Sequence, residues 1–402
     1  MGNSACVANL RIAFVHGVPL GMGGLGVQSA NALARLDEVG KVVSLGPSGA
    51  GHTASASRAQ ATPHRSSPSP VKPWMRRYTS LRWARGKAQE LTDRAIGKWA
   101  AGELDALRPN FCYAFTQVAL ETLEWAKRTG TPSMLESPNG HIRNFRDVYD
   151  REARAWCGGR YRGHPTWEMV HRVEEEYELA DSIRVSSEWA RSSLILGGVA
   201  PEKIAVFQQS VDLERFCPSV RELSACSGRL KICFVGSLDL RKGFVYLLRA
   251  MRTIGADRVC IEIAGATGDR CSAELFRRER KGLVVNQRVG DPIPVYHGAE
   301  ILAFPTLEDG SPFAVAEAMS CGLPVIVTDA CGAAEWVTEG INGWVVKATD
   351  FRSMAEALES AITRRAELPF MGEKARVSTE LRVSHESQSR LATWVRQAAG
   401  MT

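Results

Sequence analysis

Short apolar runs alternate with amphipathic stretches along the first half of this chain. The runs at 10–16 (LRIAFVH), 41–46 (KVVSLG) and 111–115 (FCYAF) hold few polar residues. Such runs are typical of strands buried on both faces of a parallel sheet. Helical patterns such as VQSANALARL (27–36) separate them, so the pattern predicts an α/β unit with a parallel sheet covered by helices. Two further strands are expected at 132–137 (PSMLES) and 182–187 (SIRVSS).

A second series of strands and helices follows a break in periodicity at 213–229, which we interpret as a hinge. The chain is therefore expected to hold two Rossmann-like domains, residues 1–213 and 214–384. From about residue 384 the pattern predicts a final amphipathic helix with no strand after it. The strands expected in the second domain lie at 230–237 (LKICFVGS), 258–265 (RVCIEIAG), 282–287 (GLVVNQ), 300–306 (EILAFPT), 324–329 (PVIVTD) and 343–346 (GWVV).

Length and composition agree with two globular domains. The chain has 402 residues, which favours two cores over one, and it is 45% apolar and 23% charged. No run of 18 apolar residues occurs, so no membrane span is expected, and the first residues lack the pattern of a secretion signal. Cys6 stands where an N-myristoylation signal needs Ser or Thr. The ten cysteines form no C-x-x-C pair, which is typical of a reducing cytosol and argues against structural zinc.

The net charge of +6 is concentrated in one region. Residues 47–73, rich in Gly, Ser, Ala and Pro, predict a long loop, and ten Lys or Arg lie between Arg58 and Lys98 against two acids. Indole rings favour a membrane interface, and each cation near an anionic surface gains about 1 kcal/mol. Two interpretations fit this basic segment: docking on an anionic membrane, or a solvated loop followed by a basic helix. Nucleic-acid binding is not favoured, because no nucleic-acid-binding module accompanies the basic residues. The interleaved aromatic residues are Trp74, Tyr78, Trp83 and Trp99.

The segment FPTLEDGSPFAVAE (304–317) predicts an anion site. Ser311 is a good N-cap and Pro312 a good first helical residue, so free N–H groups and the helix dipole would face an anion such as a diphosphate. Gly310 lets a ligand approach the backbone, and Glu317 is placed to accept hydrogen bonds from ribose hydroxyls. The alternative is a capped helix with an exposed acid.

The segment VGSLDLRKG (235–243) places cations at the carboxyl edge of the second sheet, where ligands bind in open α/β sheets. Arg241 and Lys242 are candidates to neutralise the charge on a departing diphosphate. Asp309, in the turn of the preceding motif, is a candidate partner for sugar hydroxyls. The alternative for the two cations is a solvated pair at the start of a helix.

Two weaker motifs lie in the first half. GMGGLG (21–26) fits G-x-G-x-x-G, but the next strand ends without the acid that a dinucleotide site needs. We interpret it as backbone that approaches a ligand phosphate or sugar; the alternative is a simple turn. His141, in ESPNGHIR (136–143), follows a predicted strand and is a candidate to bond a sugar hydroxyl, although a single histidine is more often structural.

Together these segments resemble the retaining glycosyltransferases of family four (glycosyl transferases group 1). That family has the GT-B fold, in which two Rossmann-like domains face each other across a deep cleft. Residues 308–346 look like its donor signature, with Asp309 and Glu317 as the acid pair, and 235–243 looks like its diphosphate loop. The resemblance extends from about residue 11 to 360.

The resemblance implies a role for each matched residue. The sequence departs from the family pattern at two positions: Ser237 stands where the family commonly has Arg, and Asp309 stands where it usually has the longer Glu. It also implies that the helix over 385–402 packs back on the first domain. The implied catalytic residues are His141, Lys242, Asp309 and Glu317, and the implied donor-binding residues are Gly23, Gly24, Ser237, Arg241, Lys242, Gly310, Ser311, Pro312, Phe313 and Glu317.

The sequence therefore predicts a retaining transferase that moves a sugar from a UDP- or GDP-linked donor to the hydroxyl of a sugar, lipid-linked or small-molecule acceptor. Cell-envelope polysaccharide or glycolipid synthesis is the expected setting, in the cytoplasm with peripheral docking on the inner face of the membrane. No metal or other cofactor is expected, because cations and a helix N-terminus would stabilise the leaving group. The alternatives are an epimerase or phosphorylase on the same fold, or a non-catalytic nucleotide-sugar-binding protein.

Overall fold

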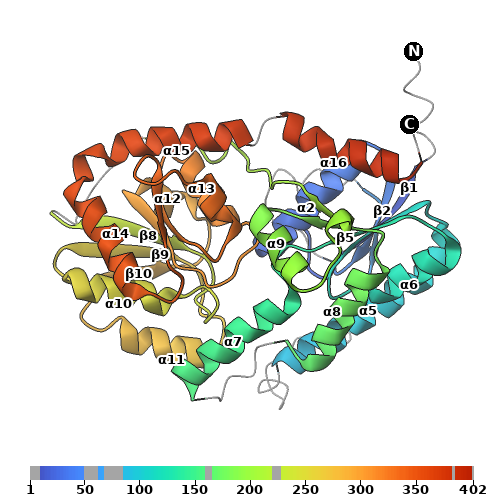
Figure 1. Cartoon of the computed structure of the whole chain (residues 1–402), viewed down its shortest axis with the longest axis horizontal. Coiled ribbons are helices and arrows are strands. Elements are labelled where there is room, and N and C mark those ends of the chain that lie inside the picture. The colour runs from blue at the N-terminus through green and yellow to red at the C-terminus, as the bar shows by residue number, and fades with distance from the viewer. Residues whose placement is uncertain are drawn as a thin grey trace.

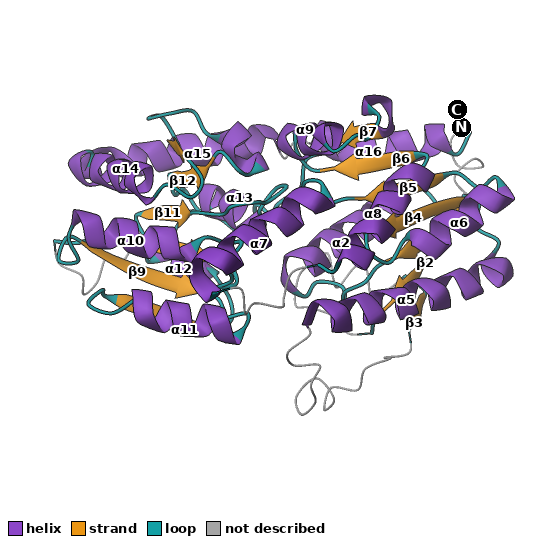
Figure 2. Cartoon of the chain, turned by 60° about the horizontal axis from the view of Figure 1, so that its bottom comes forward, coloured by secondary structure: helices purple, strands orange, loops and turns teal. Residues whose placement is uncertain are grey.

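The computed structural model describes residues 10–48, 62–67, 85–158, 165–219, 228–382 and 385–400 (Figure 1). Its strands form two parallel sheets, and all strands of the first sheet precede all strands of the second. Figure 2 shows the two sheets side by side, each with helices packed around it. The predicted pair of Rossmann-like units is present in this arrangement. No helix in the described part of the chain is both long and apolar enough to cross a bilayer.

The first sheet has seven strands in the order β3-β2-β1-β4-β5-β6-β7. Its central strand β4 is buried along its whole length, which explains why the sequence shows an unbroken apolar run there. The strands are β1 (Arg11–Val15), β2 (Lys41–Gly46), β3 (His64–Ser66), β4 (Phe111–Phe115), β5 (Ser133–Glu136), β6 (Ser182–Val185) and β7 (Ile204–Val206).

The second sheet has six strands in the order β10-β9-β8-β11-β12-β13. In both sheets the strand order reverses beside the first strand of the unit, and the loops that leave the carboxyl ends at this switch point are where ligands bind in such folds. The strands are β8 (Leu230–Val235), β9 (Val259–Ala264), β10 (Val285–Arg288), β11 (Ile301–Phe304), β12 (Val325–Thr328) and β13 (Gly343–Val346).

Helices connect the strands, and several begin at the side-chain caps that the sequence offers. Thr166, Ser187, Asp269 and Asp350 each accept a backbone N–H in the first turn of their helix. The helices of the first half are α2 (Gly23–Leu36), α5 (Arg85–Leu107), α6 (Leu120–Thr129), α7 (Ile142–Cys157), α8 (Trp167–Leu179) and α9 (Glu188–Leu196). Those that follow are α10 (Phe244–Ile254), α11 (Arg270–Glu279), α12 (Ile293–His297), α13 (Phe313–Ser320), α14 (Phe351–Thr363), α15 (Leu368–Arg382) and α16 (His385–Ala398).

Two local predictions were wrong. The glycine motif is not a loop before a helix, because α2 already begins at Gly23 and the glycines form its first turn. The expected loop over 47–73 contains the edge strand β3. Residues 49–61 and 68–73 of that loop lie outside the described part of the chain, as do Trp74, Tyr78 and Trp83 of the predicted membrane-docking segment.

Two helices join the halves. The last helix, α16, crosses back to the first half and packs against α2, with Leu391 and Val395 in the core of the first sheet (Figure 1). Helix α7 leaves the first sheet but places Tyr149 and Ala153 in the core of the second. Glu152 of α7 accepts hydrogen bonds from Trp156 Nε1 (2.9 Å) and from Tyr246 Oη of α10 (2.8 Å).

A disulfide between Cys157 and Cys271 fixes the end of α7 to α11. Nothing in the spacing of the ten cysteines, which is typical of a reducing cytosol, indicated such a pair. The two residues are 114 positions apart, so only the folded chain brings them together. The first and second halves are therefore joined by a covalent link in addition to the main chain.

Candidate functional site

The loop between β8 and α10 carries two cations of the candidate site. Asp239 shapes this loop: Ser237 Oγ donates to its Oδ2 (2.5 Å) and Lys242 N donates to its Oδ1 (3.0 Å). Gly243 ends the loop with a φ of 65°, and a Cβ there would collide with the carbonyl oxygen of Pro305. The loop therefore lies directly against the turn that follows β11.

Arg241 and Lys242 both reach that turn. Lys242 Nζ contacts Asp309 Oδ2 and lies 4.9 Å from the centre of the Phe304 ring. Arg241 Nη1 donates to the carbonyl oxygen of Glu308 (2.5 Å) and lies 3.4 Å from Asp309 Oδ2. Burial raises the pKa of the Asp309 carboxyl, but the two cations outweigh it and hold the pKa below its usual value. Asp309 is thus a carboxylate at neutral pH.

Helix α13 begins one residue later than the sequence predicts. Pro312, with φ of −70° and ψ of 122°, has extended backbone and is itself the N-cap, and no side chain caps the helix. The prediction that Ser311 is the cap was therefore wrong, because the helical conformation starts only at Phe313. Val315 N of this first turn donates to the carbonyl oxygen of Pro312 (3.2 Å), and no side chain caps the remaining first-turn N–H groups.

Glu317, in the middle of α13, faces α12. Tyr296 Oη donates a hydrogen bond to its Oε2 (2.7 Å). Burial raises the pKa of Glu317 to about 7, because the Tyr296 hydrogen bond only partly offsets the loss of hydration. The carboxyl group therefore exchanges its proton near neutral pH.

Replacing Glu317 with glutamine is expected to change the pH dependence of stability. In the folded protein the pKa lies above the ordinary value of 4.5, so folded wild type binds more protons than unfolded chain between pH 4.5 and 7 and loses stability as the pH rises through 7. The Gln variant lacks this loss. Relative to wild type, its free energy of unfolding should rise by about 3 kcal/mol between pH 4.5 and 8, as measured by urea unfolding. A difference between the two proteins that is equal at both pH values would contradict the shift.

The loop after β5, in the first half, lies on the turn after β11. Gly140 N donates to Glu308 Oε1 (2.8 Å), and Ser187 Oγ donates to the carbonyl oxygen of Gly310 (2.5 Å). A Cβ on Gly310 would collide with the carbonyl oxygen of Pro138. Glycine at 310 is thus required by close approach of the first half. The candidate site lies where the two halves meet.

His141 comes directly after Gly140 in the sequence, and its contacts are those of a structural residue. Its Nδ1 accepts from Arg143 N (3.3 Å) as the cap of α7, and its ring lies 5.2 Å from that of Tyr177. A Cβ on Gly197 would collide with the ring. Burial lowers the pKa of His141, so the ring is neutral at pH 7. Its predicted role toward a sugar stays a prediction.

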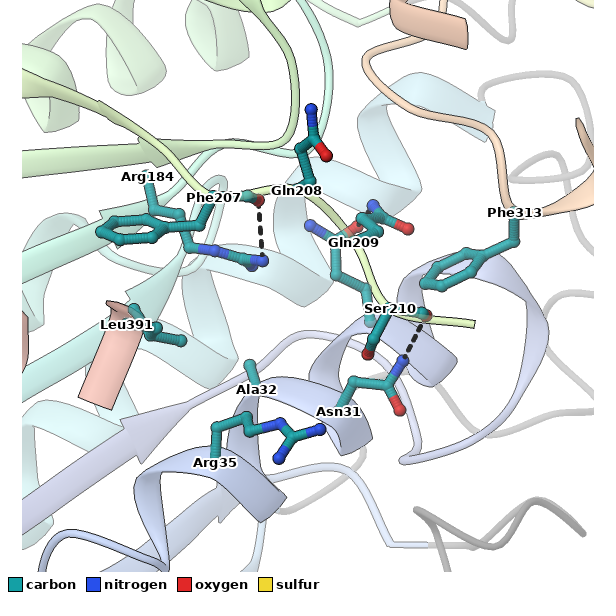
Figure 3. A pocket seen from close by; sticks show the side chains of 11 residues that line it. Asn31, Ala32, Arg35, Arg184, Phe207, Gln208, Gln209, Ser210, Phe313 and Leu391 are labelled. Carbon is teal, nitrogen blue, oxygen red and sulfur yellow. Dashed lines mark hydrogen bonds between the residues drawn. The ribbon is translucent and has the colours of Figure 1, made fainter. Parts of the chain in front are cut away.

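Gly23 and Gly24 lie at the open start of α2. A Cβ on either would meet nothing within 4 Å, whereas one on Gly26 would collide with the carbonyl oxygen of Pro19. Further along α2, Gln28 and Asn31 line a pocket together with Phe313 of α13. Figure 3 labels Asn31 and Phe313 in this pocket. The first turns of α2 and α13 therefore belong to elements that face each other across the boundary between the halves.

The structure brings most of the predicted residues together. Arg241, Lys242 and Asp309 are in direct contact, while Ser237 orders the loop through Asp239. Sequence reasoning missed Glu308 and Gly140, which link this group to the first half. Glu308 was visible as the acid beside Asp309, but its partner is 168 positions away, and local spacing gives no signal for such a pair.

Comparisons with known proteins agree with this geometry. Residues 229–364 match the family model "Glycosyl transferases group 1". This match lies within the second half of the chain. The chain is 27% identical over 180 residues to the capsular polysaccharide biosynthesis glycosyltransferase CapM of Staphylococcus aureus, an alignment that covers 42% of the chain. It is 28% identical over 200 residues to a D-inositol 3-phosphate glycosyltransferase of Mycobacterium sp. (strain KMS), over 46% of the chain. The chain spans about half the length of these relatives, 47% and 45% respectively.

Solved structures match almost the whole chain. The structure of Anabaena Alr3699/HepE with UDP and glucose superposes with a TM-score of 0.70 at 14% identity, covering 96% of this chain and 100% of that one. The sucrose-phosphate synthase from Thermosynechococcus elongatus superposes with a TM-score of 0.74 at 14% identity, covering 96% and 98%. The predicted GT-B fold is confirmed by these neighbours and by the two Rossmann-like halves.

Proposed function

We propose that this protein is a retaining glycosyltransferase that takes a sugar from a nucleotide-diphosphate sugar and transfers it to an acceptor hydroxyl. The observation that carries the proposal is the convergence of Lys242 and Asp309 beside the uncapped start of α13, where the two halves meet. A point cation and free N–H groups together suit a diphosphate. The similarity to CapM supports polysaccharide synthesis as the setting.

In the proposed complex Lys242 exchanges its partner. The amine leaves Asp309 for the donor diphosphate, which frees Asp309 to accept from hydroxyls of the transferred sugar. The first-turn amides of α13 hold the same phosphates, and Glu317 accepts from the ribose. Gly23 and Gly24 approach from the first half, since the space beside them is open. No metal or other cofactor has a part in this scheme.

Transfer with retention follows from attack on the same face of the sugar. The acceptor oxygen forms a bond to the anomeric carbon while the bond from that carbon to the diphosphate oxygen breaks. The acceptor proton passes to the departing phosphate, so atoms and charge balance. Lys242 and the α13 amides stabilise the charge that develops on the leaving group, which is often the largest contribution to catalysis.

A thermal-shift screen tests the proposal directly. UDP, GDP, ADP and their sugar conjugates are compared, because a ligand bound only by the folded state raises apparent stability. The donor that shifts the transition is then incubated with and without acceptors. Transfer that requires an acceptor supports the proposal, whereas conversion of the sugar without an acceptor identifies an epimerase. No shift with any nucleotide would remove the assignment.

The first half also offers a surface for an anionic membrane, and we propose peripheral docking there. Leu91 of α5 and Trp167 at the start of α8 are both 48% exposed. Basic side chains lie nearby: Lys87 Nζ is 3.8 Å from Glu168, and Arg94 pairs with Glu90 on α5. An exposed indole beside cations suits the interface of a bilayer that carries anionic lipid.

The double substitution Leu91→Ala and Trp167→Ala is expected to reduce sedimentation with anionic liposomes at least severalfold. The apolar side chains supply insertion and the cations supply attraction, so wild-type binding should also fall as salt rises. Phe370→Ala, which removes an exposed aromatic ring from α15, is the matched control and should leave binding unchanged. Wild-type binding that is absent, or indifferent to salt, would refute the proposal.

A further inference from the structure

Glu308 is a buried acid at the boundary between the two halves. Its side chain is completely inaccessible, and burial raises the pKa of its carboxyl. One oxygen accepts from Gly140 N (2.8 Å) in the first half, and the other lies 3.4 Å from Arg241 Nη1 in the second. A buried carboxylate needs partners for both oxygens, and here each half provides one.

Glu308 belongs to a chain of alternating charges. Glu308, Arg241, Asp309 and Lys242 contact one another in that order, and each side chain is at most 14% exposed. Two carboxylates and two cations give a net charge of zero. In such a buried group the removal of one charge leaves another without compensation, so the remaining members must rearrange.

Arg241 is enclosed by the first half as well. Its guanidinium carbon lies 5.3 Å from the centre of the Phe145 ring, and it hydrogen-bonds Tyr149, both on α7. Protein groups of both halves thus hold Arg241 beside Asp309, and its predicted role toward a diphosphate stays a prediction.

We propose that Glu308 is a positioning residue of the donor site, an inference that rests on the proposed function. Its carboxylate fixes Arg241 to the Gly140 loop, and Arg241 sets the place of Asp309. Asp309 in turn holds Lys242 until a donor diphosphate replaces Asp309 as the partner of the lysine amine. Glu308 touches no ligand and acts through this chain of contacts.

The first test needs no ligand. In the Glu308→Ala variant the Gly140 N–H loses its acceptor, and its hydrogen exchange, measured by mass spectrometry on peptides spanning that residue, should rise about tenfold or more. Glu308→Gln keeps an acceptor oxygen and should leave exchange close to wild type. Glu300→Gln is the matched control, because Glu300 is a buried glutamate that also accepts a backbone N–H and pairs with an arginine, away from the boundary.

The second test separates binding from turnover. Glu308→Gln gives the buried group a net charge of +1, so UDP, used as the probe, should bind about fivefold more tightly in calorimetry. Turnover with the donor found in the screen should fall at least about tenfold, because Arg241 then draws Asp309 away from the sugar. A merely structural role would weaken binding and turnover together, and Glu300→Gln should change neither by more than about twofold.

Two results would overturn the inference: unchanged Gly140 exchange in Glu308→Ala, or weaker UDP binding in Glu308→Gln. If wild type binds no nucleotide, the proposed function fails, and the exchange measurement alone decides whether Glu308 fixes the Gly140 loop. The two proposals can therefore fail separately.

Discussion

Lys242→Ala is expected to reduce the rate of sugar transfer by about 10²- to 10³-fold, the range found when one preorganised charge-stabilising donor is removed. The lysine lies over the Phe304 ring and is held in place by Asp309, which belongs to the turn that leads into α13. Without it, the developing charge on the diphosphate would be stabilised by backbone N–H groups alone. Steady-state kinetics with the donor found in the screen measures the loss.

The matched control for this prediction is Lys347→Ala. Lys347 also pairs with an aspartate, Asp329 (2.8 Å), but its side chain is 79% exposed. Its removal should leave transfer unchanged. Thermal unfolding of both variants separates a catalytic loss from a folding defect. A Lys242→Ala enzyme with wild-type rates would exclude this residue from the donor site.

Glu136→Ala is expected to destabilise the protein by about 3 to 5 kcal/mol, the usual cost of removing one partner from a buried ion pair. Glu136 is inaccessible and accepts from Arg184 Nη1 at 2.5 and 2.6 Å, from Gln28 Nε2 at 2.5 Å and from Tyr113 Oη. Its loss would leave the Arg184 guanidinium buried without a carboxylate, in contact with the carbonyl oxygen of Phe207 (3.2 Å) and the Tyr113 side chain. Urea unfolding measures the change.

An exposed pair provides the comparison for Glu136. Glu274 accepts from Arg270 Nε (2.8 Å) on the surface of α11, and both side chains are more than half exposed. Glu274→Ala should cost less than about 1 kcal/mol, because water already solvates both charges. A loss of similar size in the two variants would mean that burial does not determine the value of the Glu136 contacts.

The strands could be predicted from sequence wherever they are buried. The expected runs coincide with β2 and β4, whose residues are mostly buried and mostly apolar. β3 could not be predicted, since His64, Arg65 and Ser66 are all exposed at the sheet edge and carry no apolar pattern. Glycine is a poor helix former, so the first turn of α2 was also missed; Gly26 is there because a side chain would meet Pro19.

The site could be predicted only where its residues follow one another in sequence. The pair Arg241 and Lys242 and the acid Asp309 stood out because each follows a strand at the same sheet edge. Glu308 did not stand out, because its place in the site depends on a hydrogen bond from Gly140, which lies in the other half. The surroundings of His141 were equally hidden, since Tyr177 and Gly197 enclose its ring only after α8 and α9 have packed.

The bond between Cys157 and Cys271 gives the chain a closed ring of main chain and sulfur. Any single cut within that ring, including the passage from the first sheet to the second, leaves both fragments attached until a thiol reagent releases them. The two lobes would therefore stay together as one particle after such a cleavage under oxidising conditions, and would separate on a denaturing gel only after reduction.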